Sequence, residues 1–163
     1  MRIHRCPALI LLYLFCSAAN GAERGGPPPV VEADSHFLKL ERPSSPNHWL
    51  AAPAGFPGRP DEIAQVFTVP VAELRAAFKA VLLQNPRMEV AGESAAGLHA
   101  VARTRVFGFR DDIHVQFIAL GPQQSTLALY SASRVGYWDL GTNRRRVGDL
   151  LARTATLLEA SRP

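Results

Sequence analysis

The stretch "IHVQFIALGPQQSTLALYSAS", residues 113–133, sets the fold class. It holds two runs rich in β-branched, aromatic and aliphatic residues, at 113–120 and 126–133, joined by a short link that contains Gly121 and Pro122. Two such runs on either side of a short turn predict a pair of antiparallel strands.

Side chains alternate along these strands and along a neighbouring stretch, "LHAVARTRV" at 98–106. In the run at 113–120, Ile113, Val115 and Phe117 share one face, and His114 and Gln116 share the other. The earlier stretch separates in the same way, into Ala100, Ala102, Thr104 and Val106 against His99, Val101, Arg103 and Arg105. We therefore expect one buried face and one open, solvated face.

Working outward, the pattern predicts further strands at 63–69 and 87–91 and two amphipathic helices. The first helix starts near Pro70, ends at Asn85-Pro86, and has an apolar stripe of Leu74, Ala77, Phe78, Val81 and Leu82. The second helix, at 144–158, has a stripe of Val147, Leu150, Leu151, Thr154, Leu157 and Leu158. The order β-α-β-β-β-β-α predicts an α+β fold in which both helices cover one face of an antiparallel sheet.

Composition limits the chain to one domain and gives no sign of nucleic-acid binding. A chain of 163 residues, 47% apolar and 20% charged, suits one core and leaves no room for two. The net charge of +4 is a mild excess. Arginine carries nearly all of it, because Lys39 and Lys79 are the only lysines.

The N-terminus predicts export. Arg2 and Arg5 precede a short apolar run at 8–15 and then small residues, which is typical of a signal peptide at 1–21 with cleavage near 19–22. An uncleaved N-terminal anchor is the alternative. Residues 22–40, with their Gly and Pro runs, predict a flexible leader, and 41–163 form the single domain.

Export removes both cysteines, Cys6 and Cys16, so the mature chain has no disulfide and no thiolate. Removing Arg2 and Arg5 from 18 basic residues leaves 16 against 14 acidic ones, so the mature chain is nearly neutral. The apolar run is too short for a membrane span. We expect a periplasmic or extracellular protein with no membrane span after cleavage.

A second stretch, "YSASRVGYWDLGTNRRR" at 130–146, places three arginines where the last helix begins. Asn143 is the predicted N-cap, so positive charge falls in the first turn, where it opposes the helix dipole. Arg145 should face solvent, with Asp149 as its i+4 partner. The remaining arginines need anionic partners, and these side chains form the candidate site: Asp111, Asp112, Arg134, Asp139, Asn143, Arg144 and Arg146.

Three functions are open for this Arg/Asp cluster. The first is a structural network around the turns, since adjacent charges commonly pair within the chain. The second is binding of an anionic small molecule, an envelope polymer or a protein partner by a non-enzymatic exported domain. The alternative is a hydrolase that uses Asp111, Asp112 or Asp139, with Arg134 and Arg146 holding an anionic group.

Other chemistries have weaker support in the sequence. Ser131 or Ser133 would need His99 or His114 as a base, and the chain has no nucleophile-elbow motif. The histidines lack paired metal-ligand spacing, so we expect no metal and no cofactor; those considered are His36, His48, His99 and His114.

The chain resembles the bacterial family of domain of unknown function 1499 (DUF1499). The resemblance rests on "RPSSPN" at 42–47, "ARTRVFGFRDDIHV" at 102–115 and the stretch that ends in "NRRRV". The pattern is carried by Phe109, Asp111, Asp112, Ser131, Ser133, Arg134, Gly136, Asp139, Gly141, Asn143 and Arg146. The resemblance implies a domain and no established activity.

Two positions depart from the family pattern. His48 stands where members tend to have cysteine, and Tyr130 where an arginine is common. The first departure removes any thiol role at that position. The resemblance also implies that Arg134 and Arg146 belong to the shared pattern, whereas Arg144 and Arg145 are particular to this chain.

The signal-peptide prediction is checked by intact-mass measurement of protein recovered from the envelope fraction. The polypeptide should begin after Ala19, Gly21 or a neighbouring residue, because small residues follow the apolar run directly. A full-length mass would contradict export by cleavage.

Overall fold

The structure is a computed structural model, and it describes Phe37 and residues 42–162. The predicted signal peptide and, apart from Phe37, the predicted leader lie outside the described residues. Within the described part of the chain, neither helix has the length and hydropathy needed to cross a bilayer.

Six strands form one sheet, in the order β2-β1-β6-β5-β4-β3. The strands are β1 (His48–Ala52), β2 (Glu62–Ile63), β3 (Met88–Glu93), β4 (Gly97–Arg103), β5 (Arg110–Gly121) and β6 (Gln124–Ser133). The helices are α2 (Val71–Leu83) and α3 (Thr142–Ala160). The predicted α+β class is confirmed.

The β3-β4-β5-β6 meander pairs antiparallel throughout, and β5-β6 is its longest ladder. The ladder runs from the Asp111–Ser133 pair to the Gly121–Gln124 pair, so Pro122 and Gln123 make the turn. This is the hairpin that the alternation at 113–133 predicts.

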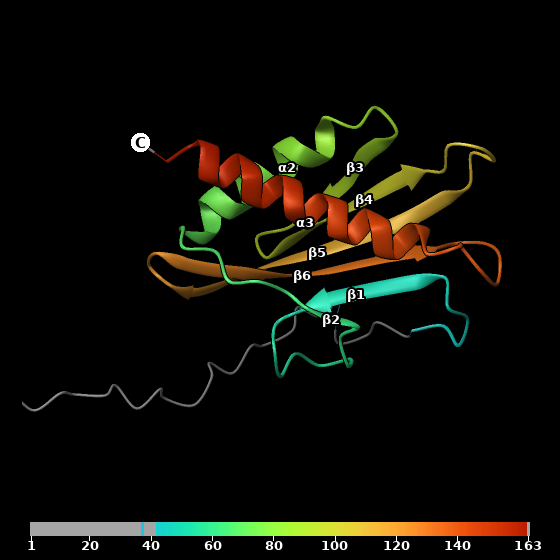
Figure 1. The fold of residues 1–163 in the computed structure, drawn as a ribbon, viewed down its shortest axis with the longest axis horizontal. Coiled ribbons are helices and arrows are strands. Elements are labelled where there is room, and N and C mark those ends of the chain that lie inside the picture. Colours follow the sequence, from blue (N-terminus) through green and yellow to red (C-terminus); the bar gives the residue numbers. More distant parts are fainter. Residues whose placement is uncertain (1–36, 38–41, 163) are drawn as a thin grey trace, which may run out of the picture.

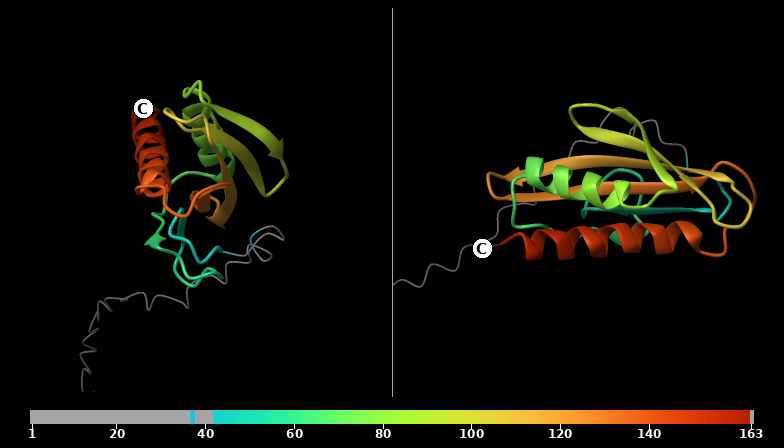
Figure 2. Two further views of the ribbon diagram at one scale, coloured as in Figure 1. Left: turned by 90° about the vertical axis from the view of Figure 1, so that its right-hand side faces the viewer. Right: turned by 90° about the horizontal axis from the view of Figure 1, so that it is seen from above.

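Both helices cover the same face of the sheet (Figures 1 and 2). Leu74, Phe78 and Leu82 of α2 are fully buried, and so is Val147 of α3. They pack on the alternate residues of the strands that face them, including Ala100, Ala102, Ile113, Val115, Phe117, Leu127 and Leu129. The shared core explains why each helix has an apolar stripe on one side only.

The first strand was predicted at the wrong place. Residues 63–69 do not form a strand: only Glu62–Ile63 pair with β1, and Phe67 makes an isolated bridge to Ser125. The missed strand is β1, which lies antiparallel to β6 and parallel to β2, so this edge of the sheet is mixed. A five-residue strand beside a Pro/Gly-rich loop has too little periodicity of its own, and pairing with β6 determines it.

Alternation predicts that the second face of the sheet is open and solvated, and this prediction is wrong for part of the face. Part of it carries a smaller core of Phe37, Leu50, Ala52, Phe56, Ile118, Ala128 and Tyr130. Phe37 and Phe56 meet edge to face, with ring centroids 5.5 Å apart. Alternation identifies which side chains share a face, but it does not show which loop returns to cover that face.

Truncation of Leu150 tests the shared core. Leu150 is 3% exposed between α3 and the sheet, so Leu150→Ala should lower the free energy of unfolding by about 2–5 kcal/mol. The control is Leu83→Ala, at the end of α2, where the side chain is 53% exposed and the loss should stay below about 1 kcal/mol. Urea denaturation of both variants measures the difference, and equal losses would contradict this packing.

Candidate functional site

Arg146 and Asp111 form a buried ion pair beneath the start of α3. Arg146 Nη2 donates to Asp111 Oδ2 at 2.5 Å, and the two side chains are 8% and 1% exposed. Arg146 Nη1 also donates to Ser131 Oγ at 2.9 Å and to Asn143 Oδ1 at 2.6 Å. The guanidinium therefore uses these donors inside the protein, which favours a structural role.

Asn143 lies at the centre of this network and has no exposed surface. Its Nδ2 donates to the backbone oxygen of Asn47 and to Asp139 Oδ2, both at 2.7 Å, and its Oδ1 accepts from Ser131 Oγ at 2.7 Å. Asn47 Nδ2 in turn donates to the Gly136 carbonyl. One amide thereby joins the chain before β1, strand β6, the β6–α3 loop and α3.

The helix start differs from the prediction. Helix α3 begins at Thr142, with Gly141 as its N-cap, so Asn143 is not the cap residue. Asp139, two residues before the N-cap, supplies the side-chain acceptor: its carboxylate accepts from Gly141 N at 2.9 Å and from Asn143 N at 2.7 Å. Gly141 has φ of 73°, a conformation in which glycine has no steric penalty. Asp139 supplies the negative charge that a helix N-terminus favours.

Asp112 faces the opposite side of the sheet from Asp111. Arg134 Nε and Nη2 donate to its two oxygens, each at 2.8 Å, and His99 Nε2 lies 2.7 Å from Oδ1. The pKa of the Asp112 carboxyl is lowered to about 2. The main cause is the hydrogen bonding from Arg134, and the bond to His99 acts in the same direction, against the effect of burial.

The predicted single cluster is thus two separate groups. Both aspartates lie in strand β5 rather than in a turn, and successive strand residues point to opposite faces. Asp111 joins Arg146 under α3, whereas Asp112 joins Arg134 on the other face. Arg134 and Arg146 do pair with aspartates, as predicted from the sequence.

The two arginines outside the family pattern are exposed and bind neighbouring groups. The guanidinium of Arg144 lies over the ring of Trp49, 5.0 Å from its centroid. Arg145 faces solvent as predicted, but it donates to the Leu140 carbonyl at 2.9 Å and makes no ion pair with Asp149. Sequence spacing favoured the i+4 partner, and the β6–α3 loop offers a nearer acceptor.

The serine–histidine arrangement is not formed. Ser131 is buried and donates to Asn143, on the helix side of the sheet. His99 and His114 share the face of Asp112, on the other side. The sheet therefore separates this serine from both histidines.

A groove of about 850 Å³ opens beside the buried network, at one end of the sheet. Its base includes Ala102, Asp111, Ser133 and Arg146. Its walls are the α2–β3 turn at 85–88, the β4–β5 loop at 104–109, the β6–α3 loop at 134–141 and the N-terminal half of α3. Both loops lie at the same end of the molecule, on the right in Figure 1. This volume is within the range of small-molecule pockets.

Exposed apolar side chains concentrate on these two loops. Among the described residues ten large hydrophobic side chains are exposed, and seven belong to the loops: Val106, Phe107, Phe109, Val135, Tyr137, Trp138 and Leu140. Phe107 is 73% and Trp138 68% exposed, and the Phe107 ring stacks on Phe109 at 5.4 Å. A concentrated patch of this kind marks a binding surface more often than scattered single residues do.

The groove is also basic. It is lined by Arg87, Arg103, Arg105, Arg145, Arg146 and Arg153 against Asp111, Asp139 and Asp149. Asp111 is already paired with Arg146, and Asp139 accepts backbone N–H groups at the start of α3. Arg87 and Arg105 have no ion-pair partner among the described residues. The rim therefore carries positive charge that no acidic side chain of the groove neutralises.

Leu140 occupies an unusual backbone conformation on the rim. Its φ is 55°, in the left-handed region, and its side chain is 65% exposed. A leucine in this conformation costs roughly 1–2 kcal/mol, which burial does not offset here. An exposed apolar side chain held in a strained conformation points to a function for the rim.

The sequence pattern did not indicate most of this groove. It predicted residues 104–106 as the end of a strand, whereas β4 ends at Arg103 and these residues begin the exposed loop. The signal that was available is the aromatic content of both loops, "VFGF" at 106–109 and "GYW" at 136–138. Turns normally favour polar residues, so aromatic turns are an indication of a binding surface.

Comparison with known proteins gives a family and no activity. Residues 31–153 match the family described as "Protein of unknown function (DUF1499)". No curated protein matches the sequence. Among solved structures, the crystal structure of TTHA0849 from Thermus thermophilus is similar at 11% identity and a TM-score of 0.37, over 71% of this chain and 99% of that one. The chain belongs to the DUF1499 family.

The Arg146–Asp111 pair is tested by removing one partner. Arg146→Ala leaves a buried carboxylate without its cation, so the free energy of unfolding should fall by about 3–5 kcal/mol in chemical denaturation. Arg145→Ala, one position away and exposed, should cost less than about 1 kcal/mol.

If Arg146→Ala does not fold, the double variant Asp111→Asn, Arg146→Met removes both charges together. It should recover a large part of the lost stability, because no unpaired charge then remains. Equal effects of Arg145→Ala and Arg146→Ala would contradict a structural role for the pair.

Proposed function

We propose that this DUF1499 protein is an exported, non-enzymatic binding domain whose groove holds an amphipathic anion. The ligand class is a molecule with a carboxylate or phosphate group joined to an apolar body. The observation that carries the proposal is the coincidence of exposed apolar loops with surplus arginines around one groove.

The apolar half of the ligand fits the two loops. Phe107, Phe109 and Trp138 stand at the rim, and burying aromatic side chains of this size on a ligand is strongly favourable. The acidic half fits Arg87 and Arg105, since arginine binds carboxylate and phosphate through paired donors. The groove therefore has both parts of an amphiphile-binding surface.

The hydrolase alternative has less support. Asp111 is buried in an ion pair, Asp139 accepts backbone donors of α3, and Asp112 lies on the opposite sheet face. A catalytic carboxylate must reach the substrate atom on which it acts. None of the three combines exposure with a place in the groove.

Tryptophan fluorescence tests the groove directly. The chain has two tryptophans, so Trp49→Phe leaves Trp138 on the rim as the only one. Dodecyl phosphate, titrated below its micelle concentration, should shift Trp138 emission to the blue and saturate. Neutral dodecyl maltoside should bind at least about tenfold more weakly, the effect of losing one charged contact of roughly 1.4 kcal/mol. Inorganic phosphate alone should leave the emission unchanged.

Two matched pairs of charge variants locate the anion. The double variant Arg87→Ala, Arg105→Ala should lower the affinity for dodecyl phosphate by about tenfold or more, because both arginines line the groove. Arg59→Ala with Lys79→Ala removes the same charge away from the groove and should leave the affinity unchanged. Equal binding of the neutral amphiphile would remove the anion from the proposal, and no change in Trp138 emission with any amphiphile would overturn it.

Leu140→Gly adds a control that separates binding from stability. Glycine relieves the left-handed backbone, so the variant should be as stable as the parent or more stable by about 1 kcal/mol. It should nevertheless bind dodecyl phosphate more weakly, because it loses an apolar side chain at the rim. A variant that loses stability and keeps its affinity would contradict a binding role for Leu140.

A further inference from the structure

A second group of chemically active side chains lies on the sheet face away from the helices. His99 of β4 and His114 of β5 are direct partners across the antiparallel ladder. Their rings stack, with centroids 4.4 Å apart and an angle of 10° between the planes. Asp112 lies two residues before His114 on the same face, with Oδ1 2.7 Å from His99 Nε2.

We propose that His99, Asp112 and His114 bind a divalent first-row transition metal. Each side chain offers one ligand atom, and these atoms lie within 4.8 Å of one another. Two imidazoles and a carboxylate suit Zn²⁺ or its neighbours in the series rather than Mg²⁺ or Ca²⁺, which prefer oxygen ligands.

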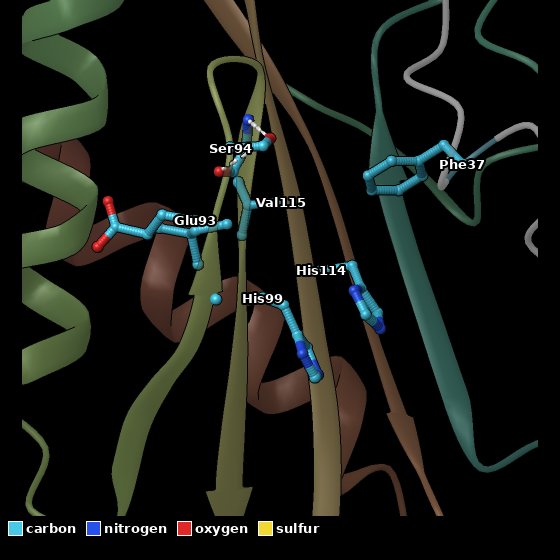
Figure 3. A pocket seen from close by; sticks show the side chains of 9 residues that line it. Phe37, Glu93, Ser94, His99, His114 and Val115 are labelled. Atoms are coloured by element: carbon cyan, nitrogen blue, oxygen red, sulfur yellow. Dashed lines mark hydrogen bonds between the residues drawn. The ribbon is translucent and has the colours of Figure 1, made fainter.

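Both histidines are placed to reach one ion, and their stacked rings must rotate to bind it, because an imidazole nitrogen binds a metal in the plane of its ring. Figure 3 shows His99 and His114 side by side, with both rings extending in the same direction from neighbouring strands. Glu93 extends the other way, toward α2, where it pairs with Arg75 and Lys79. The nearby carboxylate of Glu93 is therefore committed elsewhere, and Asp112 is the acidic ligand.

An ion would enter between His99 and Asp112. Their Nε2 and Oδ1 atoms lie at hydrogen-bonding distance, 2.7 Å apart. Two ligands of tetrahedral zinc, each about 2.0 Å from the metal, lie roughly 3.3 Å apart. A side-chain rotation closes this difference. The metal then takes the place of the proton shared by Nε2 and Oδ1, and that proton moves to Nδ1 of the same ring or to solvent.

Arg134 positions the carboxylate without blocking it. It binds Asp112 through two hydrogen bonds of 2.8 Å, and each carboxylate oxygen has a further lone pair. Partners of this kind fix the orientation of metal ligands. Three protein ligands leave a fourth position open, and a hollow of about 330 Å³, lined in part by His99 and His114, provides access to the histidines.

Metal binding is tested with protein purified without a histidine tag and treated with a chelator. Calorimetric titration with ZnCl₂ should give one site per chain, and Zn²⁺ should raise the melting temperature while Mg²⁺ does not. His99→Ala and His114→Ala should each lower the affinity for Zn²⁺ by at least about 10–100-fold. Mutation of residues that only orient a metal ligand already lowers metal affinity by that factor. The matched control, His48→Ala, removes a described histidine outside the cluster and should leave binding unchanged.

Electron paramagnetic resonance of the wild-type protein with Cu²⁺ gives a readout that needs no variant. Two nitrogen ligands should appear in the hyperfine structure. The proposal is overturned if the wild type shows no saturable Zn²⁺ binding, or if binding disappears in His48→Ala and persists in His99→Ala. It is equally overturned if Cu²⁺ shows no nitrogen ligands.

Discussion

The buried side chain of Asn143 is the contact on which the arrangement of this molecule depends most. It has no exposed surface, so every bond that it makes replaces one to water. It receives hydrogen bonds from Ser131 and Arg146 and donates to the chain at Asn47 and to Asp139. Four segments that are distant in sequence are thereby held at one point, and the ends of the groove loops are anchored beside it. Removing one member of the network would leave its buried partners without hydrogen bonds, which costs stability.

The alternation of strand β5 divides the chemistry of the protein between two surfaces. Asp111 and Asp112 are adjacent in sequence, yet one lies under α3 and the other faces away from both helices. The first neutralises a buried arginine and so stabilises the base of the groove. The second holds Arg134 and meets His99. A single charge cluster in the sequence therefore becomes a structural ion pair on one face and a candidate ligand set on the other.

The groove combines a rigid base with exposed walls. Hydrogen bonds and an ion pair fix the base, whereas aromatic side chains on two loops remain in contact with water. Leu140 shows that this exposure carries a cost, because its backbone is in the left-handed region and its side chain is largely exposed. Binding sites commonly retain local strain of this kind, and the surrounding structure supplies the stability.

The sequence by itself determined the elements with strong periodicity. The hairpin at 113–133 and the stripes through Phe78 and Leu150 predict the meander and two helices on one face, because burial of an apolar face leaves few arrangements in a chain of this length. Pairing of Arg134 and Arg146 with aspartates was also predictable from charge. Tertiary structure alone decided what depends on distant neighbours. Strand β1 forms by pairing with the edge of β6, Gly141 rather than Asn143 is the N-cap of α3, and His99 meets His114 through the register of two strands. Register, caps and loop positions are set by contacts between residues far apart in the chain, and periodicity along one segment contains no information about them.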